Sequence, residues 1–279
     1  MHPKSTPENI FDFRLGIANF SLKVECNHTK LVENLAARYA AFPSSHKIQF
    51  TAQINLVGAE RISSLLDTKT NFQNGILNFS APGYQGYINE KAGFGYLELS
   101  SAYPIEDIDY FLRVALALVA HNADCILMHT AGIIRNERAY LFFGHSGSGK
   151  TTICQSSLNS SSLGALKILN DDLILLQPHG DIWLAHGTPF WNPTQIAEPS
   201  NQYAPIAGLY YLIQDKQVFT QKLSKSKAIA ALLSNIPVIP QDSVRSIHLL
   251  NLLNRIQNDA PVCELHFLPD DSFWNVIQE

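Results

Sequence analysis

Cysteines are few in this sequence, and they lie far apart along the chain. The 279 residues include only four, with no Cys-x-x-Cys spacing: Cys26, Cys125, Cys154 and Cys263. Disulfide frameworks and structural zinc sites need paired or clustered cysteines. We therefore expect reduced, mostly buried thiols, as is typical of a cytoplasmic protein.

A long hydrophobic run is also missing. The longest run, residues 114–120, is far shorter than the roughly 20 apolar residues that a membrane helix needs. Residues 1–9 are polar, carry two prolines and lack the apolar segment of a signal peptide. The sequence therefore predicts a cytoplasmic protein with no membrane partner.

Positive charge is not concentrated anywhere in the chain. There are 20 Lys and Arg against 24 Asp and Glu, which gives a net charge of −4 and an isoelectric point near 6.2. Nucleic-acid-binding domains usually carry a basic patch or stripe, so we expect no nucleic-acid partner. The 46% of apolar residues suffices for one composite domain or two.

The first part, residues 1–104, reads as a β-rich α+β region. Residues 13–24 alternate with period two but slip by one residue, so they form one bulged strand or two short strands. Helical spacing over 31–42 ends before a proline. We expect further strands over 48–56 and 76–79 and a hairpin over 86–99. No catalytic constellation occurs in this part.

In residues 105–279, apolar strands alternate with helices, which predicts an α/β domain. A strongly amphipathic helix covers 106–121. The expected strands and later helices are 124–129, 139–143, 166–169, 173–176, 182–185, 207–214 and 262–267 for strands, and 224–233 and 242–256 for helices.

Residues 144–152, Gly-His-Ser-Gly-Ser-Gly-Lys-Thr-Thr, fit the phosphate-loop pattern G-x-x-x-x-G-K-[ST]. The strand 139–143 precedes them and a helix over 151–158 follows, which is the context the motif requires. Lys150 is expected to reach the β- and γ-phosphates of a bound polyphosphate, and the Thr151 hydroxyl to bind Mg²⁺. The remaining phosphate-binding residues are Gly144, Ser146, Gly147, Ser148, Gly149 and Thr152.

Asp171 and Asp172 form a second anchor about twenty residues downstream. A carboxylate after the strand that follows a phosphate-loop helix is a usual Mg²⁺ anchor, and a second one can accept a proton from an incoming hydroxyl. Spacing alone leaves His129 open between a buried histidine and a site residue. It equally leaves open whether Arg245 or Arg255 supplies a cation over the γ-phosphate.

Three segments in this order resemble the catalytic domain of the bacterial HPr serine kinase/phosphorylase family, and most closely its divergent HPr kinase-like members. They are 129–132 (His-Thr-Ala-Gly), the strand and loop 140–151, and 170–172 (Asn-Asp-Asp). Segments 187–191, 204–209 and 267–269 are also similar. The resemblance covers about residues 125–279.

The resemblance implies a fold related to phosphoenolpyruvate carboxykinase, with ATP and Mg²⁺ as cofactors. It implies that Lys150 and Thr151 bind phosphate and metal, and that His129 lies near the transferred phosphate. Of Asp171 and Asp172, one would be the base and one a metal ligand, with the order left open. Catalytic residues would thus be His129, Lys150, Asp171 and Asp172, with Thr151, Asp171 and Asp172 at the metal.

The sequence also departs from the family. His145 stands where HPr kinases have Asp, and their glycine-rich signature after the acidic pair is not evident. We therefore expect an ATP-dependent kinase acting on a serine-type hydroxyl of a peptide, protein or small molecule, with HPr itself in doubt. The alternative is a catalytically weak ATP-binding module that regulates a partner. HPr kinases form hexamers, so a homo-oligomer stays open.

Overall fold

The computed structural model describes residues 10–58, 68–160, 163–190, 196–238 and 242–277. The chain divides into two compact units, Met1–Val119 and Ala120–Glu279. Helix α2 (Pro104–His121) thus belongs almost wholly to the first unit, whereas the sequence-based division at 104/105 assigns it to the second part.

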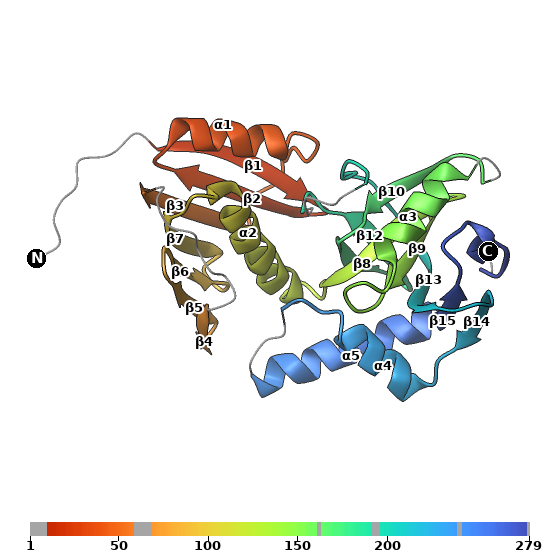
Figure 1. Ribbon diagram of the computed structural model, residues 1–279. Coiled ribbons are helices and arrows are strands. Elements are labelled where there is room, and N and C mark those ends of the chain that lie inside the picture. Colours follow the sequence, from red (N-terminus) through yellow and green to blue (C-terminus); the bar gives the residue numbers. More distant parts are fainter. Residues whose placement is uncertain (1–9, 59–67, 161–162, 191–195, 239–241, 278–279) are drawn as a thin grey trace, which may run out of the picture. The chain divides into compact units, whose positions relative to one another are not determined.

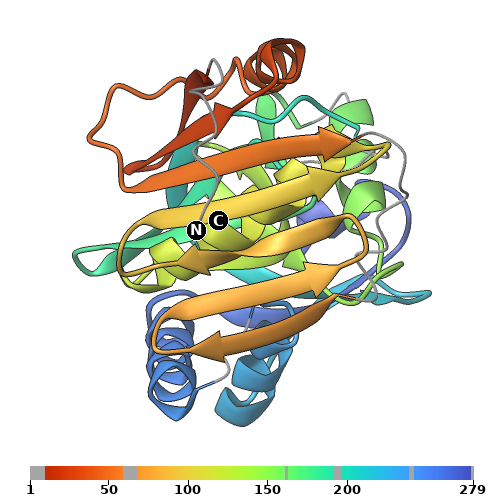
Figure 2. The same cartoon turned by 90° about the vertical axis from the view of Figure 1, so that its left-hand side faces the viewer.

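The first unit is built on a seven-stranded sheet with the order β1-β2-β3-β7-β6-β5-β4 over the residues described (Figure 2). Parallel pairs join β2 to β3 and β3 to β7, and the other neighbours are antiparallel. The strands are β1 (Phe11–Ile17), β2 (Phe20–Cys26), β3 (Phe50–Gly58), β4 (Lys69–Gln73), β5 (Ile76–Ala81), β6 (Tyr84–Asn89) and β7 (Phe94–Ser100).

The first two strands settle the alternative left open by the sequence. Ile17 pairs with Phe20, so Ala18 and Asn19 form a tight turn between two antiparallel strands. Ala18 adopts a φ of 51°, the left-handed conformation that such hairpin turns require. The one-residue slip in the apolar pattern is therefore a turn between two strands, not a bulge within one.

Two helices pack on this sheet. Helix α1 (Thr29–Arg38) ends four residues before the predicted end at 42. Helix α2 covers one face of the sheet through Phe111, whose ring lies 6.4 Å from that of Phe50 and 5.7 Å from that of Phe79. Gly95 allows this approach, because a Cβ there would lie 2.8 Å from the Phe111 ring.

The second unit is a mixed α/β structure. Over the described residues its sheet follows the order β10-β8-β11-β12-β13-β15-β14, and β9 pairs with both β8 and β13. The strands are β8 (Ile126–Arg135), β9 (Arg138–Phe143), β10 (Leu166–Asn170), β11 (Leu173–His179), β12 (Ile182–Gly187), β13 (Tyr203–Gln214), β14 (Phe219–Lys222) and β15 (Val262–Phe267).

Strand β8 pairs with different neighbours along its length. Residues up to His129 pair with β11, whereas residues from Thr130 onward pair with β9 and, from Gly132, with β10. Strand β9 runs antiparallel to β8 and parallel to β13. The end of β9 is therefore flanked by His129 on one side and by β13 on the other.

Strand β9 is buried on both faces. Leu141 and Phe143 belong to a core with helices α4 (Lys225–Leu233) and α5 (Ser243–Asp259). Tyr140 and Phe142 face a second core with helix α3 (Lys150–Asn159) and the short helix η2 (Ser272–Asn275) (Figure 1). This layering of helices on both faces of a sheet confirms the predicted α/β class.

Candidate phosphate-binding site

The loop after β9 joins this strand to helix α3, as the motif predicts. Gly147 has a φ of 80° and Gly149 a φ of 108°, conformations that other residues rarely adopt. A Cβ at Gly149 would also lie 2.6 Å from the Phe267 ring. The glycines of the motif are therefore required by the backbone path and by the packing beneath the loop.

The N-terminus of α3 has no side-chain cap. Its N-cap residue is Gly149, and Thr151 and Thr152 lie half-buried in its first turn. The hydroxyl of Ser148 is buried, and no described residue forms a hydrogen bond with it. First-turn amides and the helix dipole favour an anion at such an end. The loop thus offers donors in the place that a polyphosphate would use.

The Lys150 side chain contacts the backbone of its own loop. Its Nζ donates to the carbonyl oxygen of Gly144 at 2.9 Å, with that of His145 at 3.4 Å. Burial lowers the pKa of Lys150, while the nearby Asp172 and Asp171 carboxylates act in the opposite direction. The charges of both carboxylates therefore favour the protonated form of Lys150. His145 itself is exposed.

Asn170 shapes the turn that carries the acidic pair. Its Oδ1 accepts from the backbone amides of Asp172 at 2.7 Å and Leu173 at 3.1 Å. Its Nδ2 donates to the carbonyls of Thr188 at 2.9 Å and Phe190 at 2.8 Å. This side chain is fully buried, so its hydrogen bonds hold the turn between β10 and β11 in place from the protein interior.

Asp172 and His129 meet beside the loop strand. Nδ1 of His129 lies 3.0 Å from Oδ1 of Asp172, and the amide of Thr130 donates to the Asp172 carbonyl at 3.0 Å. His129 is 36% exposed at its side chain, and Asp172 is 10% exposed. Thr130 in turn pairs with Phe143, the residue before the loop. The structure therefore brings two predicted site residues together at the end of β9.

Asp171 is buried, and its carboxylate is only weakly compensated. It is 3% exposed, and neither carboxylate oxygen has a hydrogen-bond partner of normal geometry among the described residues. Burial, and secondarily the charge of Asp172, raise the pKa of Asp171, although the amides of Asp171 and Ile196 and the charge of His129 oppose this. Burial and Asp171 also raise the pKa of the neighbouring Cys154.

An unsatisfied buried carboxylate fits a cation. The oxygen atoms of Asp171, Asp172 and Thr151 are the ligand type that Mg²⁺ prefers. The described residues hold no cluster of three or more His, Cys, Asp or Glu side chains able to bind a metal alone. Mg²⁺ beside a nucleotide needs only one or two carboxylates, since phosphates and water complete its shell.

Asn235 was not foreseen from the sequence. It follows α4, and its Oδ1 accepts from the Gly144 amide at 3.2 Å. Its own carbonyl accepts from the His129 amide at 2.8 Å, and its Nδ2 donates to Ala231 at 2.9 Å. One buried residue therefore connects the start of the phosphate loop with His129.

Arg245 and Arg255, the two candidate cations, have different surroundings, and so does His186 near the end of β12. Arg255 contacts the Gly180 carbonyl at 2.7 Å and lies over the Trp183 ring, and Arg245 pairs with Asp242. His186 is buried and stacked on Tyr203, and burial lowers its pKa to about 4. These contacts do not connect any of the three residues with the loop. The sequence also predicts an exposed loop over the polar, proline-bearing residues 192–205; residues 192–195 lie outside the described residues, and residues 203–205 begin β13.

No protein-family model and no curated protein matches the chain. The resemblance to HPr kinases therefore stays a prediction that rests on residues 125–279 and their order. Among the helices that the structure describes, none is both long and apolar enough to cross a membrane.

Proposed function

We propose that the second unit is an ATP-dependent kinase that transfers the γ-phosphate to a serine-type hydroxyl of a peptide, protein or small molecule. The observation that carries this proposal is the pair of His129 and Asp172, 3.0 Å apart beside the end of β9. A phosphate loop alone indicates nucleotide binding. A carboxylate and an imidazole beside it add groups that can accept or donate a proton.

The contacts suggest separate roles for the two carboxylates. Asp172 is held by His129, whose side chain is 36% exposed, so this pair has access to an incoming hydroxyl. Asp171 is deeper and has unsatisfied oxygens, which suits Mg²⁺ binding together with Thr151. Mg²⁺, when bound, neutralises charge on the phosphates.

The proposed transfer has a simple balance. The acceptor oxygen forms a bond to the γ-phosphorus while the bond from that phosphorus to the β–γ bridging oxygen breaks. The proton of the acceptor passes to Asp172, and ADP leaves. Lys150 and the loop amides hold the phosphates in line, because positioning and charge stabilisation supply most of the catalysis in phosphoryl transfer.

Incubation with γ-labelled ATP, Mg²⁺ and extract proteins or small hydroxyl compounds tests the proposal. Lys150→Ala should reduce labelling by about 10²- to 10³-fold, in line with removal of one charge-stabilising group. The control is Lys167→Ala, an exposed lysine on β10, which should label normally. Equal labelling by the Lys150→Ala variant would mean that the loop is not the active site.

The same assay separates the kinase from the regulatory alternative. The kinase requires Asp172, so Asp172→Asn should stop labelling while ATP still binds. His129→Gln should slow it less, since the carboxylate remains. A protein that binds ATP, labels no acceptor and is indifferent to Asp171→Asn and Asp172→Asn would instead be an ATP-binding regulatory module.

A further inference from the structure

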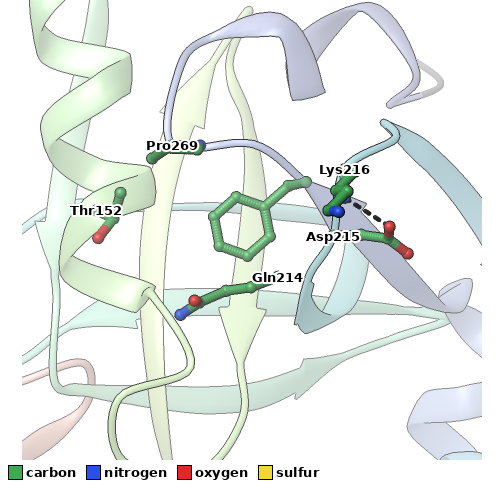
Figure 3. A pocket seen from close by; sticks show the side chains of 6 residues that line it. Thr152, Gln214, Asp215, Lys216 and Pro269 are labelled. Carbon is green, nitrogen blue, oxygen red and sulfur yellow. Dashed lines mark hydrogen bonds between the residues drawn. The ribbon is translucent and has the colours of Figure 1, made fainter.

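A pocket of ≈ 560 Å³ lies next to the loop (Figure 3). It is lined by residues from the first turn of α3, the end of β13 and the segment from the end of β15: Thr152, Gln214, Asp215, Lys216, Phe267 and Pro269. In Figure 3, Thr152 and Pro269 lie on one side, with Asp215 and Lys216 on the other. Small-ligand pockets typically measure about 300 to 1,000 Å³, so this volume is adequate for one.

The strand order places this pocket and the acidic residues on opposite flanks of the loop. Strand β9 has β8 on one side, where His129 pairs with Leu173 of β11 and contacts Asp172. On its other side β9 has β13, whose end supplies Gln214 to the pocket. The loop therefore lies between the two.

Direct contacts connect the pocket with the loop. Nε2 of Gln214 donates to the Gly147 carbonyl at 2.9 Å. The Phe267 ring packs against Gly149, and Thr152 immediately follows the expected Mg²⁺ ligand Thr151. A polyphosphate in the loop with its γ end at Asp172 would have its α end near Thr152. Whatever is attached to the α-phosphate then enters the pocket.

The lining has the mixed chemistry that a nucleoside needs. Phe267 supplies an aromatic ring, and Gln214 and Lys216 supply polar groups at the exposed edge. Asp215 is held by His266 at 2.7 Å, which keeps its carboxylate in place. We propose that this pocket binds the ribose and base of the nucleoside triphosphate, an inference that rests on the proposed ATP-binding function. Phe267 then contributes to the affinity that the nucleoside adds to that of the phosphates alone.

Calorimetric titration of the full chain with MgATP and with magnesium tripolyphosphate tests this assignment. Both ligands carry the same phosphates, so the ratio of their affinities isolates the nucleoside. Phe267→Leu should weaken ATP binding by about five- to tenfold through lost aromatic contact and leave tripolyphosphate within about twofold. Phe273→Leu is the matched control, since Phe273 lies in the same core but does not line the pocket.

Lys216→Met provides a second variant that does not depend on core packing, because Lys216 is exposed. It should lower the ratio of ATP to tripolyphosphate affinity by about threefold, while Lys222→Met on β14 should leave the ratio unchanged. A wild type that binds neither ligand would overturn the proposed function together with this inference. Equal affinity for both ligands, or an equal loss for both in Phe267→Leu, would overturn the nucleoside assignment alone.

Discussion

Two aspartates, one in each unit, are equally buried but differently surrounded. Asp109 of the first unit is 3% exposed and accepts from Tyr39 at 2.7 Å and from Arg113 at 2.7 Å, with Arg38 at 3.4 Å. Asp171 of the second unit is also 3% exposed and has no partner of normal geometry among the described residues. The two carboxylates are equally buried, so they differ in whether their oxygens have hydrogen-bond partners.

The comparison has an energetic basis. A buried carboxylate that is paired and hydrogen-bonded can be tolerated within a core, whereas an unpaired one costs free energy of folding. Asp109 joins α2 to α1 and is explained by the fold alone. Asp171 has no such explanation, and unsatisfied charges of this type are concentrated at functional sites.

The largest expected effect concerns Asp109. Asp109→Ala leaves Arg113, Arg38 and Tyr39 without their buried acceptor, so the first unit should lose about 3 kcal/mol of its unfolding free energy. Chemical denaturation followed by far-UV circular dichroism measures this loss. The control is Asp12→Ala, whose exposed pair with Lys23 should contribute less than about 1 kcal/mol. If both variants lose a similar free energy of unfolding, Asp109 is no more important to the fold than an exposed ion pair.

A smaller effect is expected at Asn235. Asn235→Leu leaves the Gly144 amide unpaired, which should cost about 1 to 3 kcal/mol of unfolding free energy and weaken the proposed ATP binding through the displaced loop. All three tryptophans, Trp183, Trp191 and Trp274, follow residue 119, so tryptophan fluorescence reports unfolding of the second unit.

Asn254→Leu, an exposed position on α5, is the matched control and should change neither property. A stable Asn235→Leu variant with unchanged ATP affinity would show that Asn235 does not hold the loop in place.

The smallest effect, at Asp171, should be a gain in the free energy of unfolding. The folded protein raises the pKa of Asp171 above its ordinary 3.8, so ionisation of this carboxyl opposes folding. Stability is therefore lost as the pH rises through the folded pKa. Asp171→Asn should stabilise the second unit by about 1 kcal/mol at pH 7, as expected when a charge without a partner is removed from a buried site.

The gain in Asp171→Asn should disappear below about pH 3.8, where the carboxyl is protonated in both states. Fluorescence-detected denaturation at several pH values measures it. The same substitution at Asp109 should be destabilising at pH 7. If Asp171→Asn also destabilises at pH 7, Asp171 is a structural residue like Asp109.

Local sequence predicted much of the second unit. The strand before the loop, the helix after it and the final strand are confirmed because each has its signal within a few neighbouring residues. Helices α4 and α5 each begin one residue after their predicted starts at 224 and 242. Strands β4 and β14 were missed because they are mostly exposed and lack apolar alternation.

The site was only partly predictable for a physical reason. His129 and Asp172 are 43 positions apart in the sequence, and no periodicity connects them. Only the family resemblance therefore indicated that they lie close together. Asn235 contacts Gly144 across 91 residues through a single amide. An isolated asparagine after a helix carries no local signal for such a contact.

The two-sided burial of β9 has a consequence for sequence variation. Residues from Ala139 to Phe143 are enclosed on both faces, so this strand has little freedom to change without loss of the fold. The exposed loop positions His145 and Ser146 are not constrained in this way. A library randomised at these two positions should therefore yield folded variants at high frequency, so the loop tip is the place to test acceptor choice in the proposed kinase.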